Sequence, residues 1–164
     1  MKFLRFKPIL IAVSALFSVS FYTGLASASC FNNATLGTAA KAADLYQVIC
    51  FNNGNVNPTR LEVIPNLQAG GAGVMVTVAK PNFLPVTESD NTNGAAINFA
   101  TCTSPSPGTA AILNGSVGIY DIFVQKSSAT SDLTSKRYGL SFYCENSSHQ
   151  EGGFAEVVAV MGLD

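Results

Sequence analysis

Short runs of alternating apolar and polar residues recur along the chain, separated by clusters of Gly, Pro, Asn and Ser. Alternation with a period of two is typical of strands that bury one face, and the chain has no long helical periodicity. In "KRYGLSFYC", for example, Tyr138, Leu140 and Phe142 share one face. The pattern predicts seven strands, at Asp44–Cys50, Arg60–Ile64, Gly73–Lys80, Ala95–Cys102, Ser116–Lys126, Lys136–Cys144 and Gly153–Leu163.

Most of these strands have one apolar face, and a single sheet would leave all of those faces in water. Two sheets packed face to face bury them. The one helix-like segment, Thr38–Asp44, is too short to form a layer. The pattern therefore predicts an all-β protein, a single β-sandwich domain of about seven to eight strands.

The first 28 residues differ from the rest. Lys2, Arg5 and Lys7 precede a mostly apolar stretch, and Ala26-Ser27-Ala28 supplies the small residues of a signal-peptidase site. Serines dilute the apolar stretch, and no basic cluster follows it, so a membrane anchor is the weaker interpretation. We expect a cleaved signal peptide at 1–28, a domain at 29–164, and no membrane insertion after cleavage.

Export changes the charge balance. Three of the nine basic residues lie in the signal, and all ten acidic residues lie after it, so the exported part has a net charge of −4. This balance argues against nucleic acid as a partner, because nucleic acid attracts basic surfaces. We expect a periplasmic or extracellular location.

The four cysteines, Cys30, Cys50, Cys102 and Cys144, all lie in the exported part. An even number in an oxidising compartment indicates two disulfides, and spacings of 20, 52 and 42 residues do not fit a zinc site. Three pairings are possible. We favour Cys30–Cys50 with Cys102–Cys144, because the first of these closes a short loop at the start of the domain.

Few residues are candidates for chemistry. His149 is the only histidine and lies in the polar stretch "CENSSHQEGG", and no serine has a nucleophile-elbow context. The loop Thr87–Gly94 is rich in oxygen ligands, and Glu88, Asp90, Asn91 and Asn93 form a possible Ca²⁺ loop, although an ordinary polar turn explains them as well. We predict no enzymatic activity, no cofactor and no other metal site.

Three segments resemble a known family. Asp44-Leu45-Tyr46, Gly118-Ile119-Tyr120 with Val124, and Tyr138–Phe142 are similar to the strand motifs of the bacterial pre-peptidase C-terminal domain. The resemblance implies a small sandwich of jelly-roll type that binds surfaces or substrates, and it carries over no functional residues. The cysteines and the last strand are not part of the family pattern.

Together these features predict an exported, non-enzymatic binding or accessory module with a protein or glycan ligand that the sequence does not identify. The alternative is a subunit of a surface fibre or other assembly, because the apolar segment "FAEVVAVMG" could pair between chains. An enzyme with an unrecognised site, built around His149 or the carboxylates of the strands, is a third hypothesis. The sequence leaves the oligomeric state open.

Overall fold

Nine strands and no helix make up the computed structural model, which describes residues 29–71, 73–127 and 133–163. The predicted signal peptide lies outside the described residues and stays a prediction. No described residue belongs to a helix long and apolar enough to cross a membrane. The strands are β1 (Ser29–Leu36), β2 (Ala43–Phe51), β3 (Arg60–Ala69), β4 (Val74–Ala79), β5 (Val86–Asp90), β6 (Ala111–Asn114), β7 (Gly118–Lys126), β8 (Lys136–Glu145) and β9 (Gly153–Leu163).

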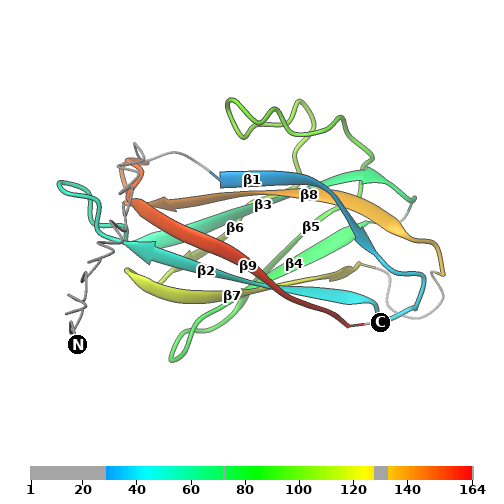
Figure 1. Cartoon of the computed structure of the whole chain (residues 1–164), viewed down its shortest axis with the longest axis horizontal. Helices are drawn as coiled ribbons and strands as arrows, with labels where there is room; N and C mark the ends of the chain where they lie inside the picture. The colour runs from blue at the N-terminus through cyan, green and yellow to red at the C-terminus, as the bar shows by residue number, and fades with distance from the viewer. Residues whose placement is uncertain (1–28, 72, 128–132, 164) are drawn as a thin grey trace, which may run out of the picture.

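The strands form two antiparallel sheets, in the orders β1-β8-β3-β6 and β5-β4-β7-β2-β9 (Figure 1). The first eight strands have the arrangement of a jelly roll, in which four strands of each sheet belong to two Greek keys. β9 is an addition that lies beside β2 and extends the larger sheet. The predicted β-sandwich is confirmed, with nine strands in place of seven to eight.

The core lies between the sheets and is built by the alternation seen in the sequence. Tyr138, Leu140 and Phe142 of β8 point inward and are fully buried. Val74, Val76 and Val78 of β4 point inward from the other sheet and are equally buried. Burial of such apolar side chains supplies the main driving force for folding.

One predicted strand is wrong. Ala95–Cys102 is irregular chain with turns, and its two large apolar residues differ in burial, since Ile97 is buried while Phe99 is 66% exposed. Three strands were missed. β1 contains an irregular step between Phe31 and Ala34, where Asn33 takes a left-handed backbone, and β5 and β6 are short or polar.

The preferred disulfide pairing is also wrong. The disulfides join Cys30 to Cys102 and Cys50 to Cys144. Cys50 and Cys144 both point into the core from opposite sheets, so their disulfide crosses the sandwich. Cys30 lies opposite Ser141 in the register of β1 and β8, on the outer face of the smaller sheet, and so it is not available to Cys50.

Candidate functional site

The outer face of β3 and β8 carries charged and buried polar side chains of the smaller sheet. Alternation along both strands turns every second residue outward, and antiparallel register places outward residues opposite one another. The opposed outward pairs are Arg60 with Glu145, Glu62 with Tyr143, Ile64 with Ser141 and Asn66 with Gly139. One end of this face is therefore ionic, and its middle is mostly uncharged.

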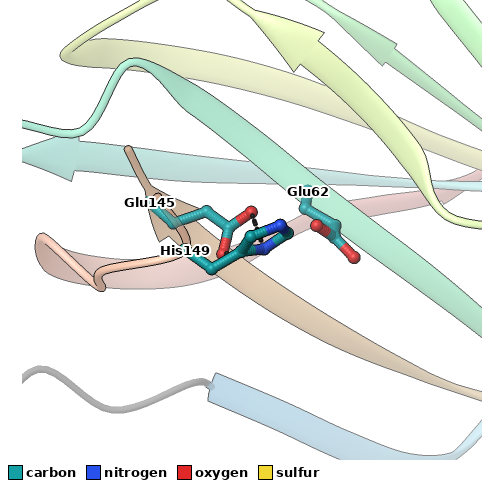
Figure 2. A group of neighbouring side chains, drawn as sticks. All are labelled: Glu62, Glu145 and His149. Atoms are coloured by element: carbon teal, nitrogen blue, oxygen red, sulfur yellow. Dashed lines mark hydrogen bonds and ion pairs between the residues drawn. The ribbon is translucent and has the colours of Figure 1, made fainter. Parts of the chain in front are cut away.

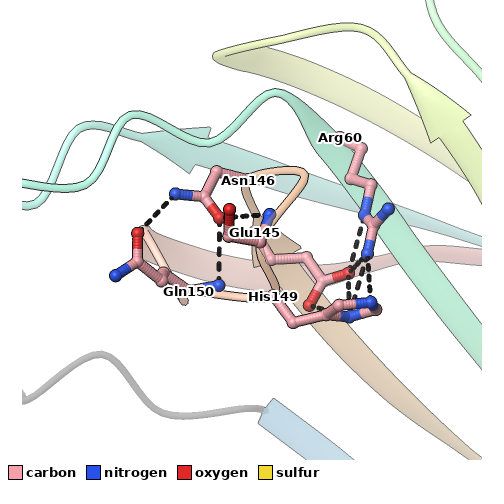
Figure 3. A network of polar contacts seen from close by, with 6 residues as sticks. Arg60, Glu145, Asn146, His149 and Gln150 are labelled. Atoms are coloured by element: carbon pink, nitrogen blue, oxygen red, sulfur yellow. Dashed lines mark hydrogen bonds and ion pairs between the residues drawn. The ribbon is translucent and has the colours of Figure 1, made fainter.

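The ionic end is organised around the carboxylate of Glu145, whose side chain is only 5% exposed. Arg60 donates two hydrogen bonds to Glu145 Oε1, one of them from Nε at 2.7 Å. His149 Nδ1 lies 3.2 Å from Glu145 Oε2 and 2.9 Å from Arg60 Nη2 (Figures 2 and 3). Charge-assisted hydrogen bonds of this kind are stronger than those between neutral groups.

Glu62 stands beside this pair (Figure 2). Burial raises the pKa of Glu62, and a hydrogen bond to Glu145 and repulsion by its charge add to the effect, while Arg60 and His149 oppose it. Ligand atoms of Glu62, Glu145 and His149 lie within 4.8 Å of one another. The Arg60 guanidinium already supplies a cation to Glu145.

His149 belongs to a turn that is held by its own polar side chains. Asn146 Oδ1 accepts hydrogen bonds from the backbone N–H of Ser148 and of Gln150, at 2.9 and 3.0 Å (Figure 3). The His149 side chain is 71% exposed. Among the described residues, its ring nitrogens make hydrogen bonds only to Arg60 and Glu145, so a serine nucleophile is not part of this arrangement.

The residues of the possible Ca²⁺ loop do not share one role. Glu88 and Asp90 lie on the inward face of β5, opposite Val76 and Val74. Both carboxylate oxygens of Asp90 accept hydrogen bonds, one from Leu67 N at 2.7 Å and the other from the N–H and hydroxyl of Thr92. Asn91 contacts Ser89 and Ser127.

These contacts are those of a polar turn that caps the end of a strand. The Ca²⁺ hypothesis stays a prediction.

A long connection between β5 and β6, residues 91–110, covers part of the outer face of β3 and β8. In Figure 1 it is the green chain above the smaller sheet. It takes the place of β6 beside β3, because β6 pairs only with Arg60–Val63. Beyond that point Gly94 N donates to Leu67 O at 2.7 Å, and Gly108 N donates to Pro65 O at 2.9 Å.

Two outward residues of β1, Cys30 and Asn32, bind the middle of this connection. Cys30 forms its disulfide with Cys102. Asn32 Nδ2 donates to Ile97 O at 2.8 Å, and Asn32 Oδ1 accepts from Ile97 N at 2.9 Å. This reciprocal pairing satisfies both backbone groups of a buried loop residue, as an adjacent strand would.

A cavity of about 150 Å³ lies between the connection and the sheet. It is lined by Ile64, Asn66, Ile97, Cys102, Thr103, Ser104, Pro107, Ser141 and Tyr143. No charged side chain is among them. Connections of this length without regular structure are uncommon in small domains and usually serve a function.

Asn66 is the polar residue that stands out in the cavity wall, because it is 1% exposed. Its Nδ2 donates to Ser104 Oγ at 2.7 Å and to the carbonyl of Ser106 at 3.3 Å. That carbonyl only accepts hydrogen bonds, which fixes the orientation of the amide. Within the described part of the chain, Asn66 Oδ1 has no hydrogen-bond donor. An unpaired buried acceptor costs about 1–3 kcal/mol.

Two hydroxyl groups of the wall are already committed as donors. Ser141 Oγ donates to the Cys102 carbonyl at 2.6 Å, and Tyr143 OH donates to the same oxygen at 2.8 Å. Burial raises the pKa of Tyr143, so its hydroxyl keeps the proton that it donates. These contacts hold Cys102 in a left-handed backbone conformation, with φ 50°. Both hydroxyl oxygens keep lone pairs for a further donor.

Sequence reasoning missed Asn66, Ser141 and Tyr143. Their only signal is their position, since each occupies an outward site of a strand whose inward residues are large and apolar. Of the residues expected to have a role, Cys102 alone lies in the cavity wall. The position of the β5–β6 connection, which turns an outward face into a wall, is a tertiary feature that the alternation of strands does not contain.

In comparisons with family models, curated proteins and solved structures, no match to this chain was found. The resemblance to the pre-peptidase C-terminal domain stays a prediction from the strand motifs.

Proposed function

We propose that the protein is an exported, non-enzymatic binding module that takes a small ligand in the cavity between the β5–β6 connection and the outer face of β3 and β8. The observation that supports this best is the cavity of about 150 Å³ itself, whose wall joins apolar side chains such as Ile64 and Ile97 to a few polar ones such as Ser141 and Tyr143. Ligand sites in proteins combine apolar walls with a few placed polar groups in this way.

The anchoring of the connection supports a preformed site. The β5–β6 connection is held over the cavity by a disulfide, by the Asn32–Ile97 pair and by the hydroxyl contacts to Cys102. Two disulfides are compatible with an oxidising, exported location. A connection that is ordered before binding lowers the entropy cost of holding a ligand.

A fragment screen followed by amide chemical shifts tests this function on the oxidised protein. We expect fragments that perturb the amides of Ile64, Ile97 and Ser104. Ile64→Phe fills the cavity from the sheet side and is expected to abolish those shifts. The matched control is Ile112→Phe, because Ile112 is a half-buried outward residue of β6 outside the cavity. Fragments that bind Ile64→Phe as well as the unmodified protein would refute this site.

A second candidate function, a subunit of a homomeric assembly, is favoured by β9. This strand lies outside the eight-stranded jelly roll and ends its sheet, so one of its edges pairs with no described strand. Nearby, Ile49 and Ile119 form an outward cross-strand pair, 39% and 51% exposed. Exposed sheet edges are templates for another chain.

Deletion of 153–164 tests this second function. If β9 joins copies of the chain, the truncated protein stays a folded monomer while the full chain gives a ladder of oligomers in native mass spectrometry. The same oligomeric state for both chains would exclude β9 as the connection between subunits.

A further inference from the structure

We infer that Asn53 is a site of spontaneous covalent modification, at which the side-chain amide cyclises onto the backbone nitrogen of Gly54 and water then opens the ring. The inference is independent of the proposed binding function. It follows from the local sequence, from the open turn that holds this pair, and from the hydrogen bonds that hold the other two Asn-Gly pairs of the chain, at 93–94 and 114–115.

The reaction needs water as its only co-reactant. The deprotonated backbone nitrogen of the residue after an asparagine attacks Cγ of the asparagine side chain. A C–N bond forms, and the side-chain nitrogen leaves as ammonia. Water then adds to one of the two carbonyls of the imide ring, which gives aspartate or isoaspartate according to the carbonyl attacked. Glycine is the most favourable residue for this attack, because it has no Cβ to shield its nitrogen.

The Asn53-Gly54 pair lies in the connection between β2 and β3, which projects from one end of the sandwich (Figure 1). Asn53 and Val56 exchange two backbone hydrogen bonds of 3.2 Å, so Gly54 and Asn55 are the central residues of a tight turn. The side chain of Asn53 is exposed, and Gly54 has open space on the side where a Cβ would stand. Among the described residues, the N–H of Gly54 has no hydrogen-bond acceptor. No hydrogen bond of this nitrogen therefore has to break before the attack.

The pair at 93–94 has the same sequence in a closed environment. Gly94 N donates to Leu67 O at 2.7 Å. A Cβ on Gly94 would lie 2.9 Å from the carbonyl oxygen of Ser106, so the chain packs closely around this glycine. The nitrogen has to give up its hydrogen bond, and the β5–β6 connection has to move, before a ring can form there.

The pair at 114–115 is enclosed in another way. Gly115 is buried, and its N–H donates to Thr59 O at 3.1 Å. A Cβ on Gly115 would lie 2.9 Å from Lys80 Cδ and 3.0 Å from the hydroxyl of Tyr120. Reaction at this pair requires local opening of the structure, and the free energy of that opening slows it.

Peptide mapping tests the site on the oxidised protein after incubation at mildly alkaline pH in water enriched in the heavy oxygen isotope. The oxygen that enters the product comes from water, so the isotope separates reaction in the folded protein from reaction during later digestion in ordinary water. Trypsin places Asn53 on peptide 42–60 and the other two asparagines on peptide 61–126, and fragment ions locate each label. We expect Asn93 and Asn114 to react at least about fivefold more slowly than Asn53, because each must first open one net hydrogen bond.

The controls separate the effect of the fold from that of the sequence. In the reduced chain unfolded in guanidinium chloride, all three pairs should react at similar rates. Asn53→Gln is expected to remove the labelled product at this turn, because glutamine needs a larger and less favourable ring, and Asn55→Gln is expected to leave the rate at Asn53 unchanged. Labelling of Asn93 or Asn114 as fast as Asn53 in the folded protein would overturn the inference. Reaction at Asn53 that is about fivefold or more slower in the folded than in the unfolded chain would also overturn it.

Discussion

At the scale of single residues, the Arg60–Glu145 pair is a buried ionic contact that is costly to break. The two side chains are 14% and 5% exposed, so removing the guanidinium leaves a buried carboxylate without its main partner. We expect Arg60→Ala to lower the free energy of unfolding by about 3–5 kcal/mol in urea titrations. Arg137→Ala removes an exposed arginine of β8 and serves as control, expected within about 0.5 kcal/mol of the unmodified protein. Equal losses in the two variants would show that the pair adds no stability.

Glu62 gives a pH dependence with a definite sign. Its pKa in the folded protein is raised, chiefly by burial and then by Glu145, so ionisation costs more in the folded than in the unfolded chain. The contribution of Glu62 to stability is therefore complete below its ordinary pKa near 4.5 and declines as the pH rises through the raised value.

Glu62→Gln keeps a hydrogen-bond donor toward Glu145 and carries no charge. We expect it to raise the free energy of unfolding at neutral pH by less than about 1 kcal/mol, as read from urea titrations, because the carboxyl is partly exposed. Near pH ~3, where Glu62 is protonated, the variant and the unmodified protein should coincide. A variant that is destabilised at neutral pH would contradict the raised pKa.

At the scale of elements, alternation predicted six of the nine strands, β2, β3, β4, β7, β8 and β9. The first five of these bury an apolar face, which the alternation of apolar and polar residues along the sequence reveals directly. β1 and β5 escaped detection for a physical reason. They carry polar side chains such as Asn32 and Asp90, whose partners belong to the distant β5–β6 connection and to β3.

The disulfides show the same limit. Cys50 and Cys144 both lie on the inward faces of their strands. Alternation along the sequence did not show that these strands, β2 and β8, belong to different sheets. Cys102 lies on a segment predicted as a strand, and its place over the outer face follows from the path of the connection.

The disulfide pairing has a direct chemical test. Trypsin cleaves after Lys41, Arg60, Lys126 and Arg137, which places each cysteine on a peptide of its own. Without reduction, we expect the Cys30 peptide to be linked to residues 61–126 and the Cys50 peptide to be linked to residues 138–164, as read by mass spectrometry. A link between the Cys30 and Cys50 peptides would refute the observed sandwich register.

The β5–β6 connection is an element whose order depends on one disulfide. Replacing both Cys30 and Cys102 by Ser is expected to speed hydrogen exchange of the Gly94 and Gly108 amides by about tenfold or more, while the core strands change less. Replacing Cys50 and Cys144 by Ser is the matched control, because that disulfide crosses the core. There we expect strands and connection to lose protection together. If hydrogen exchange of the strands and of the connection changed by the same factor in both variants, the Cys30–Cys102 disulfide would not anchor the connection separately from the core.

At the scale of the whole molecule, the two sheets share a hydroxyl network. Tyr46 of β2 and Tyr138 of β8 meet between the layers with their oxygens 2.6 Å apart, and Tyr138 donates to Asp44 Oδ2 at 2.5 Å. Burial raises the pKa of both tyrosines, and it raises the pKa of Tyr120 to about 12. The pKa of Tyr143 is raised for the same main reason. Every tyrosine of the described chain thus resists ionisation while the sandwich is folded.

This resistance predicts how the folded protein responds to alkali. A raised pKa contributes stability that is complete below pH 10, the ordinary value for tyrosine, and is lost above it. We expect the urea midpoint to stay level up to pH 10 and to fall between pH 10 and 12, with tyrosinate absorbance appearing together with the loss of the strand circular dichroism signal. Tyr120→Phe should make the fall shallower, because one ionisation no longer favours the unfolded chain. Tyrosinate absorbance that rises around pH 10 while the circular dichroism spectrum stays native would show that the hydroxyl groups between the sheets are open to solvent.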